Sequence, residues 1–361
     1  MLETPVPVRR RRRFDWPALR ADLRATVPDA TAALVVTAGI FAWLYARVEA
    51  GTSMTLQVMP ELADAGRYWM YWLCQAFGWS GLLWAWITIM LGLVRSSARP
   101  GWLRVPVARI ERWHRTTSLT TIGLMAAHAV MFFAELVRSD EDGRGWAGRL
   151  ATSFAEVFVP GVYSSGTGRI AILIGLLALY LAVPLGLAFY LRQTTGSRMW
   201  RALHRFVIVV YVLSVWHTLL YGTNVWYDGA FRTLVWLLQL PVAALFLARL
   251  LAPARRGDRL HLRDAAKRPG ALPLAARLAG RIAVAATVVG LLVVAATGRD
   301  GGRTPGVTGA GLNVTQGQVW AGLAVLLVAV AAVVHRLRPT RRAPAASEAG
   351  PSSPDGEHGR R

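Results

Sequence analysis

The sequence has little cysteine and almost no lysine, and it keeps charge out of long stretches. Its 361 residues include one cysteine, Cys74, and one lysine, Lys267. A single cysteine cannot form an internal bridge, which excludes a secreted disulfide scaffold. Residues 68–94 and 170–191 hold no charged side chain. Apolar runs of that length are typical of membrane spans, so a soluble enzyme and a disordered chain are excluded as well.

The apolar runs predict a polytopic membrane protein. Hydrophobic residues make up 54% of the chain. Eight uncharged stretches are long enough to be spans, namely 30–46, 75–94, 116–134, 170–191, 206–222, 233–248, 282–298 and 318–334. We therefore expect an all-α integral membrane protein of about eight transmembrane helices, with a six-helix core and two additional C-terminal helices.

Composition divides the chain further. Five regions are expected, namely a basic cytoplasmic N-terminal segment (1–29), a transmembrane core (30–250), a basic cytoplasmic linker (251–281), an additional helix pair (282–334) and a disordered cytoplasmic tail (335–361). The arginine run Arg9 to Arg13 also fits a twin-arginine export signal. We prefer a cytoplasmic anchor, because the next span is long enough to cross the membrane and no clear cleavage site closes it.

The positive charge follows the membrane topology. The formal net charge is +21, and 32 of the 41 basic residues lie in the segments that an N-terminus-inside threading makes cytoplasmic. This is the positive-inside bias, and it argues against nucleic acid as a partner. Both termini are therefore expected on the cytoplasmic side of a bacterial plasma membrane, in contact with lipid. The nearly exclusive use of arginine indicates a GC-rich bacterial genome.

Four of the seven histidines lie on two predicted spans, where ionisable side chains are rare and usually functional. His114 and His128 belong to the third span and are 14 residues, about 21 Å, apart. His204 and His217 belong to the fifth and are 13 residues, about 19.5 Å, apart. Both spans run from inside to outside. His114 and His204 are therefore expected at one depth near the cytoplasmic face, and His128 and His217 at another near the outer face.

Two facing histidine pairs suit two haem groups, since neutral imidazole is a good ligand for iron. A structural zinc ion would need four clustered ligands, and each level offers two. Proton transfer and simple packing remain alternatives. A spacing of 13 residues also misses the same helix face by about 140°. The fifth span must therefore distort locally, or its two haems must approach from different directions.

This histidine pattern resembles the ferric reductase-like transmembrane domain family. The resemblance covers roughly residues 70–250 and rests on His-x13-His in one span, His-x12-His two spans later, and the sequences Trp113-His114-Arg115, Leu203-His204-Arg205 and Trp216-His217. It implies two b-type haems. Electrons would enter at the haem ligated by His114 and His204 and leave through the haem ligated by His128 and His217.

Two arginines directly follow the inner histidines. Arg115 and Arg205 could pair with haem propionates, because guanidinium binds carboxylates bidentately. They equally well obey the positive-inside rule alone. Both interpretations stay open at this point.

The resemblance also predicts what the protein works with. Ferric reductases carry cytoplasmic FAD and NADPH domains, and no cytoplasmic segment here is long enough for them. We therefore expect an electron-transfer subunit of a membrane oxidoreductase, closest to stand-alone haem-binding subunits such as that of the bacterial methionine sulfoxide reductase system. FMN or FAD bound at the cytoplasmic face is a further expectation from such relatives.

The loops indicate where partners would dock. Loops 95–115 and 192–205 hold ten arginines and one acid, a surface suited to an acidic flavoprotein or a ferredoxin-like donor. Loop 135–169 could receive an extracytoplasmic acceptor, either a protein or ferric iron. The alternatives to this interpretation are a haem-free transporter, a proton relay and a structural subunit.

Overall fold

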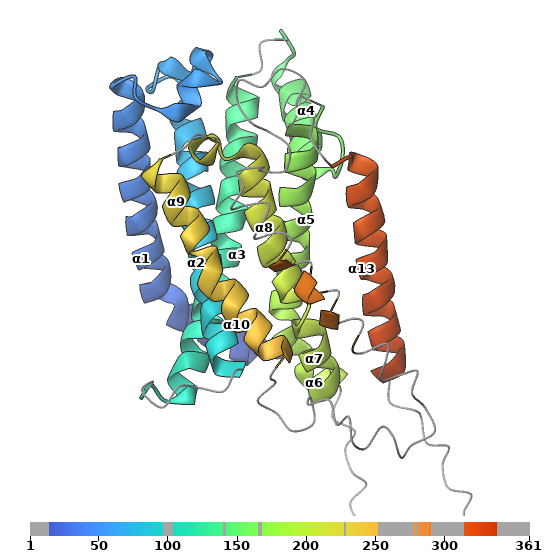
Figure 1. Cartoon of the computed structure of the whole chain (residues 1–361). Helices are drawn as coiled ribbons and strands as arrows, with labels where there is room; N and C mark the ends of the chain where they lie inside the picture. The colour runs from blue at the N-terminus through green and yellow to red at the C-terminus, as the bar shows by residue number, and fades with distance from the viewer. Residues whose placement is uncertain are drawn as a thin grey trace, which may run out of the picture.

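Helices, 3₁₀ turns and loops account for all residues that the computed structural model describes, which are 14–96, 104–139, 142–164, 168–226, 229–251, scattered positions between 278 and 289, and 314–337. The longest helices run side by side (Figure 1). They are α1 (Trp16–Glu49), α2 (Trp69–Ser96), α3 (Val107–Arg138), α5 (Gly168–Leu187) and α13 (Gln316–Leu337). The shorter ones are α4 (Trp146–Phe158), α6 (Arg192–Thr195), α7 (Ser197–His204), α8 (Val207–Tyr221), α9 (Ala230–Leu237) and α10 (Gln239–Leu251).

Seven helical segments of the described residues are long and apolar enough to cross a membrane. They are Trp16–Glu49, Trp69–Ser96, Val107–Arg138, Gly168–Thr195, Ser197–Tyr221, Ala230–Leu250 and Gln316–Leu337. The predicted all-α, polytopic membrane fold is thereby confirmed. The expected span at 282–298 lies mostly outside the described residues. The arginine run at 9–13, most of the linker and the tail beyond residue 337 lie outside them too.

The first helix is longer than its apolar run. It begins at Trp16, because the Asp15 side chain accepts a hydrogen bond from the backbone N–H of Ala18 and a proline occupies the first turn. The apolar pattern marks only the part of the helix that suits lipid, whereas the cap marks where the helix starts. This extension places two carboxylates, Asp22 and Asp29, on α1.

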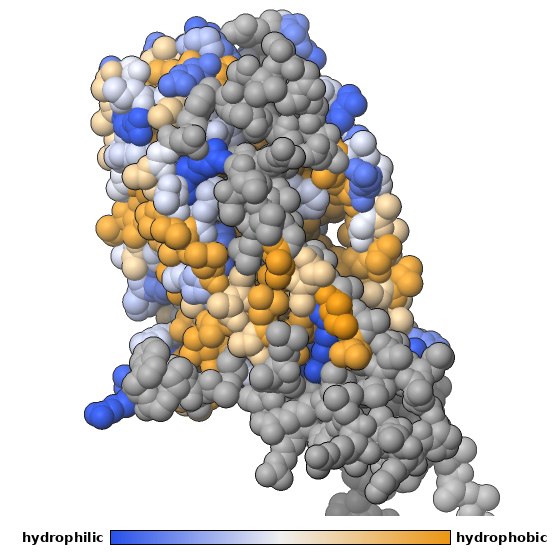
Figure 2. Space-filling view, in the orientation of Figure 1, coloured by the Kyte–Doolittle hydropathy of each residue, from blue (hydrophilic) through white to orange (hydrophobic). Residues whose placement is uncertain are grey.

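The packing order around the bundle differs from the order along the chain. Helix α2 packs along α3, α5 packs along α8, and α1 covers α2 and α3. Helix α10 crosses α2, and α13 stands at the margin against α5 and α7 (Figure 1). Apolar side chains gather around the middle of this face (Figure 2). On α13 they are widely exposed, as at Val325 and Val328, each 70% exposed, which suits a lipid environment.

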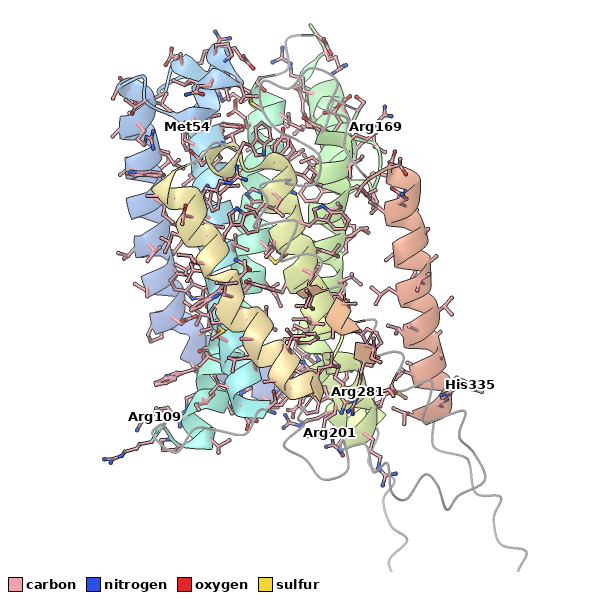
Figure 3. The ribbon with its side chains drawn as sticks, viewed as in Figure 1. Met54, Arg109, Arg169, Arg201, Arg281 and His335 are labelled. Atoms are coloured by element: carbon pink, nitrogen blue, oxygen red, sulfur yellow. The ribbon has the colours of Figure 1, made fainter. Side chains whose placement is uncertain are left out.

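The two ends of the bundle carry different loops. Arg109 and Arg201 lie at one end, together with His335, while Met54 and Arg169 lie at the other (Figure 3). We call the end with Arg109 and Arg201 the arginine-loop end, and the end with Met54 the opposite end. The predicted cytoplasmic loops 95–115 and 192–205 thus belong to the same end of the molecule.

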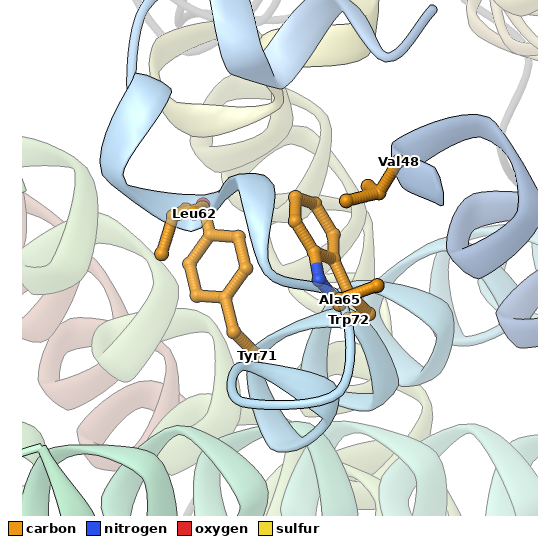
Figure 4. Close-up of a cluster of buried hydrophobic side chains, with 5 residues drawn as sticks. All are labelled: Val48, Leu62, Ala65, Tyr71 and Trp72. Atoms are coloured by element: carbon orange, nitrogen blue, oxygen red, sulfur yellow. The ribbon is translucent and has the colours of Figure 1, made fainter. Parts of the chain in front are cut away.

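The opposite end is closed by the connection between α1 and α2. Two 3₁₀ turns, Met54–Gln57 and Pro60–Ala63, fold over the bundle there. Trp72 is fully buried and packs with Tyr71, Leu62 and Val48 in one apolar cluster (Figure 4). This cluster fixes the first turn of α2, which leads directly to the site described next.

Candidate functional site

The four histidines form two facing pairs. His114 on α3 faces His204 at the end of α7, with the ring centroids 5.8 Å apart and the ring planes at 86°. His128 on α3 faces His217 on α8, with the centroids 5.9 Å apart and the planes at 77°. The structure therefore pairs the same histidines that the rise along each helix places at the same depth.

Backbone carbonyls hold three of the four imidazole rings. Nδ1 of His114 lies 2.9 Å from the carbonyl oxygen of Thr88. Nδ1 of His128 lies 2.8 Å from the carbonyl oxygen of Cys74, and Nδ1 of His217 lies 2.8 Å from that of Ala171.

These hydrogen bonds determine which ring nitrogen is available. A carbonyl oxygen can only accept, so Nδ1 carries the proton in all three rings. In the neutral imidazole, Nε2 then keeps its lone pair. Histidines that bind metals almost always donate their other N–H in this way, which orients the ring and raises its basicity as a ligand.

The fourth ring is held differently. His204 stacks on Trp200, one turn earlier on α7, with the centroids 5.5 Å apart and the planes at 25°. The helix breaks directly after it, and α8 begins at Val207. Around the break the N–H groups of Arg205 and Phe206 bond to carbonyls three residues back. Each such 3₁₀ step turns the chain by about 120° instead of about 100°. The local distortion expected from the 13-residue spacing is thus observed, and it supplies part of the missing rotation.

The segment that carries most of this arrangement matches a known family. Residues 77–215 match the family model described as ferric reductase like transmembrane component. This segment is similar to that family over 139 of the chain's 361 residues. It runs from α2 to α8 and includes His114, His128 and His204, while His217 lies just beyond its end. No curated protein and no solved structure is detectably similar to the chain.

The matched family typically binds haem b. The observed pairs fit such a group. Two imidazole nitrogens that each bind one metal ion at about 2 Å would hold their ring centroids roughly 6 Å apart. Both pairs are within that range. The described residues contain no cluster of three or more histidine, cysteine, aspartate or glutamate side chains that could hold another metal ion.

A cavity surrounds His128 and His217, the histidine pair nearer the opposite end. It is bounded by α2, α3, α5 and α8. His128 and His217 line it together with mostly apolar side chains, and the rings of Tyr71 and Tyr221 border it. Tyr221 also stacks on His217, with centroids 6.4 Å apart.

Two buried donors lie beside the pair of His114 and His204 at the arginine-loop end. Nε of Arg115 and Nε1 of Trp200 are buried and have no hydrogen-bond partner among the described residues. Nε of Arg115 lies 3.6 Å from a carboxylate oxygen of Asp22, and Arg115 also sits over the ring of Phe189. An indole N–H without a hydrogen-bond partner and a guanidinium held by a 3.6 Å ion pair suit an acidic group such as a haem propionate.

Arg205 has a different place from Arg115. It follows His204 at the end of α7 and occupies the C-cap position of that helix, within the break. Sequence reasoning selected both arginines by their neighbours in the chain. It did not identify Trp200, Asp22 or the three carbonyl acceptors, because only tertiary packing places those groups against the histidines.

Cys74 lies next to the opposite-end pair. Its sulfur is buried, is not in a disulfide and lies 3.4 Å from Nδ1 of His128. Its own carbonyl is the stronger partner of that nitrogen, at 2.8 Å. The side chain therefore packs against the ring, and its backbone anchors it.

Proposed function

We propose that this protein conducts electrons across a membrane through two b-type haems, one held by His114 and His204 and the other by His128 and His217. One observation carries the proposal. Two histidine pairs are stacked along the bundle, and three of the four rings are anchored through Nδ1 so that Nε2 is available.

The haem would supply the reversible one-electron chemistry, and the protein would supply its position and surroundings. His114 and His128 are separated by about 21 Å along α3, most of the hydrocarbon thickness of about 30 Å. The surrounding helices would exclude water between the two levels. Arg115 would hold an acidic edge group at the arginine-loop end, where its charge compensates a carboxylate.

The same contacts argue against a proton relay. A relay histidine must accept a proton on one nitrogen and release it from the other. In three of the rings Nδ1 is committed to a buried backbone carbonyl with no further exit through that atom. That arrangement suits a fixed ligand better than a group that repeatedly exchanges protons.

The proposed direction of electron transfer is supported by the distribution of charge. The arginine-loop end would face the cytoplasm of a bacterium, in accordance with the positive-inside rule. A soluble flavoprotein or a ferredoxin-like protein with an acidic surface would deliver electrons there, and an acceptor protein or ferric iron would take them at the opposite end. In this proposal the chain would work like the stand-alone haem-binding subunits of the family, such as that of the bacterial methionine sulfoxide reductase system. FMN or FAD at the cytoplasmic face would be an additional entry point.

The test is an absorption spectrum of the purified protein in detergent, before and after dithionite, with haem and flavin measured per chain. We expect sharp reduced b-type bands and close to two haems per chain. His128→Ala and His217→Ala should remove one haem, and His114→Ala and His204→Ala the other. His335→Ala is the matched control, because that histidine lies on α13 outside both pairs.

A colourless protein from cells supplied with ample haem would refute the proposal, and proton transfer or packing would then explain the histidines. The donor is tested separately. Reduction by an acidic flavoprotein should slow as salt is raised, since exposed charges are screened beyond about 10 Å at 0.1 M salt. A rate independent of salt would refute the docking surface and leave the haem proposal intact.

A further inference from the structure

The two α3 histidines each face a glycine of α2. A Cβ atom added at Gly78 would lie 3.1 Å from both Nδ1 and Cε1 of His128. A Cβ atom added at Gly92 would lie 3.1 Å from Cε1 of His114. Contacts this short are tighter than ordinary van der Waals packing, so either ring would have to move if its glycine became any other residue.

The same arrangement occurs on a different pair of helices. A Cβ atom added at Gly175 on α5 would lie 2.6 Å from Nδ1 and 2.9 Å from Cε1 of His217 on α8. This is the closest of the three approaches. A Cβ atom is fixed to the backbone, so only a movement of the His217 ring or of a helix could relieve the contact. Three independent histidines therefore pack with one ring edge directly on a glycine backbone.

Each glycine lies at the same distance along the chain from the backbone carbonyl that accepts a hydrogen bond from the facing histidine. The acceptor precedes the glycine by four residues in all three cases, as Cys74 and Gly78, Thr88 and Gly92, and Ala171 and Gly175. In an α-helix the carbonyl of residue i bonds to the N–H of residue i+4, which leaves its second lone pair unused. A side chain at i+4 tilts toward the helix N-terminus and covers the turn that contains this carbonyl. Only glycine at i+4 leaves the second lone pair open to an imidazole.

The spacing along α2 matches the spacing along α3. The acceptors Cys74 and Thr88 are 14 residues apart, and so are His128 and His114. Antiparallel helices with the same rise per residue keep two such contacts in register. The coincidence of spacing, acceptor and glycine at both levels argues against chance packing.

We infer that Gly78, Gly92 and Gly175 are positioning residues for haem ligation, which rests on the function proposed above. Each opens a helix carbonyl to the Nδ1–H of a facing histidine, and that bond aims Nε2 at the iron. A methyl group at any of them pushes the ring off its carbonyl. The haem at that level is then bound more weakly, and its iron receives less electron density from the ligand.

The experiment compares Gly78→Ala, Gly92→Ala and Gly175→Ala with wild type in the purified, detergent-solubilised full chain. The readouts are haem per chain and the midpoint potential of each haem in a redox titration. Loss of such supporting contacts typically weakens metal binding about 10- to 100-fold. We expect losses in that range, largest for Gly175→Ala. Any haem that remains at the altered level should titrate at a more positive potential.

Gly123→Ala is the matched control, because it lies on α3 between the two histidines and its added methyl would meet nothing within 4 Å. Alanine favours helix over glycine, so propensity alone would stabilise all of these variants. The control should keep both haems at wild-type potentials.

Each of these glycine variants should affect only one of the two haems, which makes the test specific. Gly92→Ala should affect the haem that His114→Ala removes, whereas Gly78→Ala should affect the haem that His128→Ala removes. General damage to the fold would affect both haems alike, and that outcome would overturn the inference. It would also be overturned if all three glycine variants kept both haems at wild-type potentials.

The two proposals fail in different ways. A wild-type protein without haem would refute the function itself. A wild-type protein with two haems, combined with unaffected glycine variants, would refute only the role of the glycines. Should Gly175→Ala not fold, Gly78→Ala and Gly92→Ala decide the question, since their contacts are 3.1 Å rather than 2.6 Å.

Discussion

Replacing Asp29 with alanine is expected to loosen α1 from the helix pair that carries His114 and His128. The Asp29 carboxylate accepts from the indole Nε1 of Trp84, which lies 3.2 Å from both oxygens, and from the hydroxyl of Thr120. Trp84 is only 5% exposed and packs in an apolar cluster. This carboxylate thus joins α1 to both α2 and α3 within the membrane-spanning region.

The two side chains that donate to Asp29 would lose different amounts of hydrogen-bond energy. The hydroxyl of Thr120 also lies 3.1 Å from the carbonyl of Thr116, so it keeps a partner. The indole of Trp84 would be left buried and unpaired, which costs about 1–3 kcal/mol. Double-mutant cycles in a membrane protein give smaller hydrogen-bond energies, about 0.6 kcal/mol on average and at most about 1.7 kcal/mol. We therefore expect Asp29→Ala to lower the free energy of unfolding by about 1–2 kcal/mol, and Asp29→Asn by less, because asparagine keeps one acceptor oxygen.

A double-mutant cycle of Asp29→Ala and Trp84→Phe would isolate this bond, with unfolding followed by denaturant titration in detergent. A coupling energy of about 1 kcal/mol is expected. Trp146→Phe is the control, because Trp146 is 78% exposed and should not couple to Asp29. If the effects of Asp29→Ala and Trp84→Phe add to within about 0.3 kcal/mol, the reasoning is refuted.

Three further predictions concern other contacts. Trp200→Leu removes the ring on which His204 stacks. The haem at the arginine-loop end should therefore be retained about 10-fold less well during gel filtration. Equal loss of both haems would contradict this prediction. Gly186→Ala would place a methyl 2.7 Å from Cδ1 of Ile122 and should cost about 1–3 kcal/mol in a denaturant titration. Ile122→Val deletes that atom and should recover most of the loss, and a failure to recover would argue against the clash. Tyr190→Phe removes a 3.0 Å hydrogen bond to a carboxylate on α1 and should lower stability by about 1–2 kcal/mol, whereas an unchanged midpoint would show that the bond contributes nothing.

Much of the architecture could be predicted because the membrane simplifies the problem. Long uncharged runs must be helices, since lipid offers no partners for the backbone. Helical rise is constant, so a separation of 14 or 13 residues converts directly into depth. The pairing of His114 with His204 and of His128 with His217 followed from this arithmetic and agrees with the observed ring contacts.

The boundaries of the first and fifth spans were harder to predict. Helix α1 starts at Trp16 because of the Asp15 cap, which no hydropathy pattern registers. The fifth span divides at His204 into α7 and α8. The 13-residue spacing indicated that some distortion was needed, but its position depends on local hydrogen bonds around Phe206.

The sequence by itself determined that the chain is an all-α membrane protein and which histidines share a depth, because both follow from composition and from rise along a single helix. Only the tertiary structure decided which helices are neighbours and what each ring touches. The carbonyl of Thr88 and the backbone of Gly92 meet His114 through the packing of α2 on α3. Residues on different helices gain such contacts from rotation about the helix axes, and rotation, unlike rise, is set by the side chains of every neighbouring helix at once.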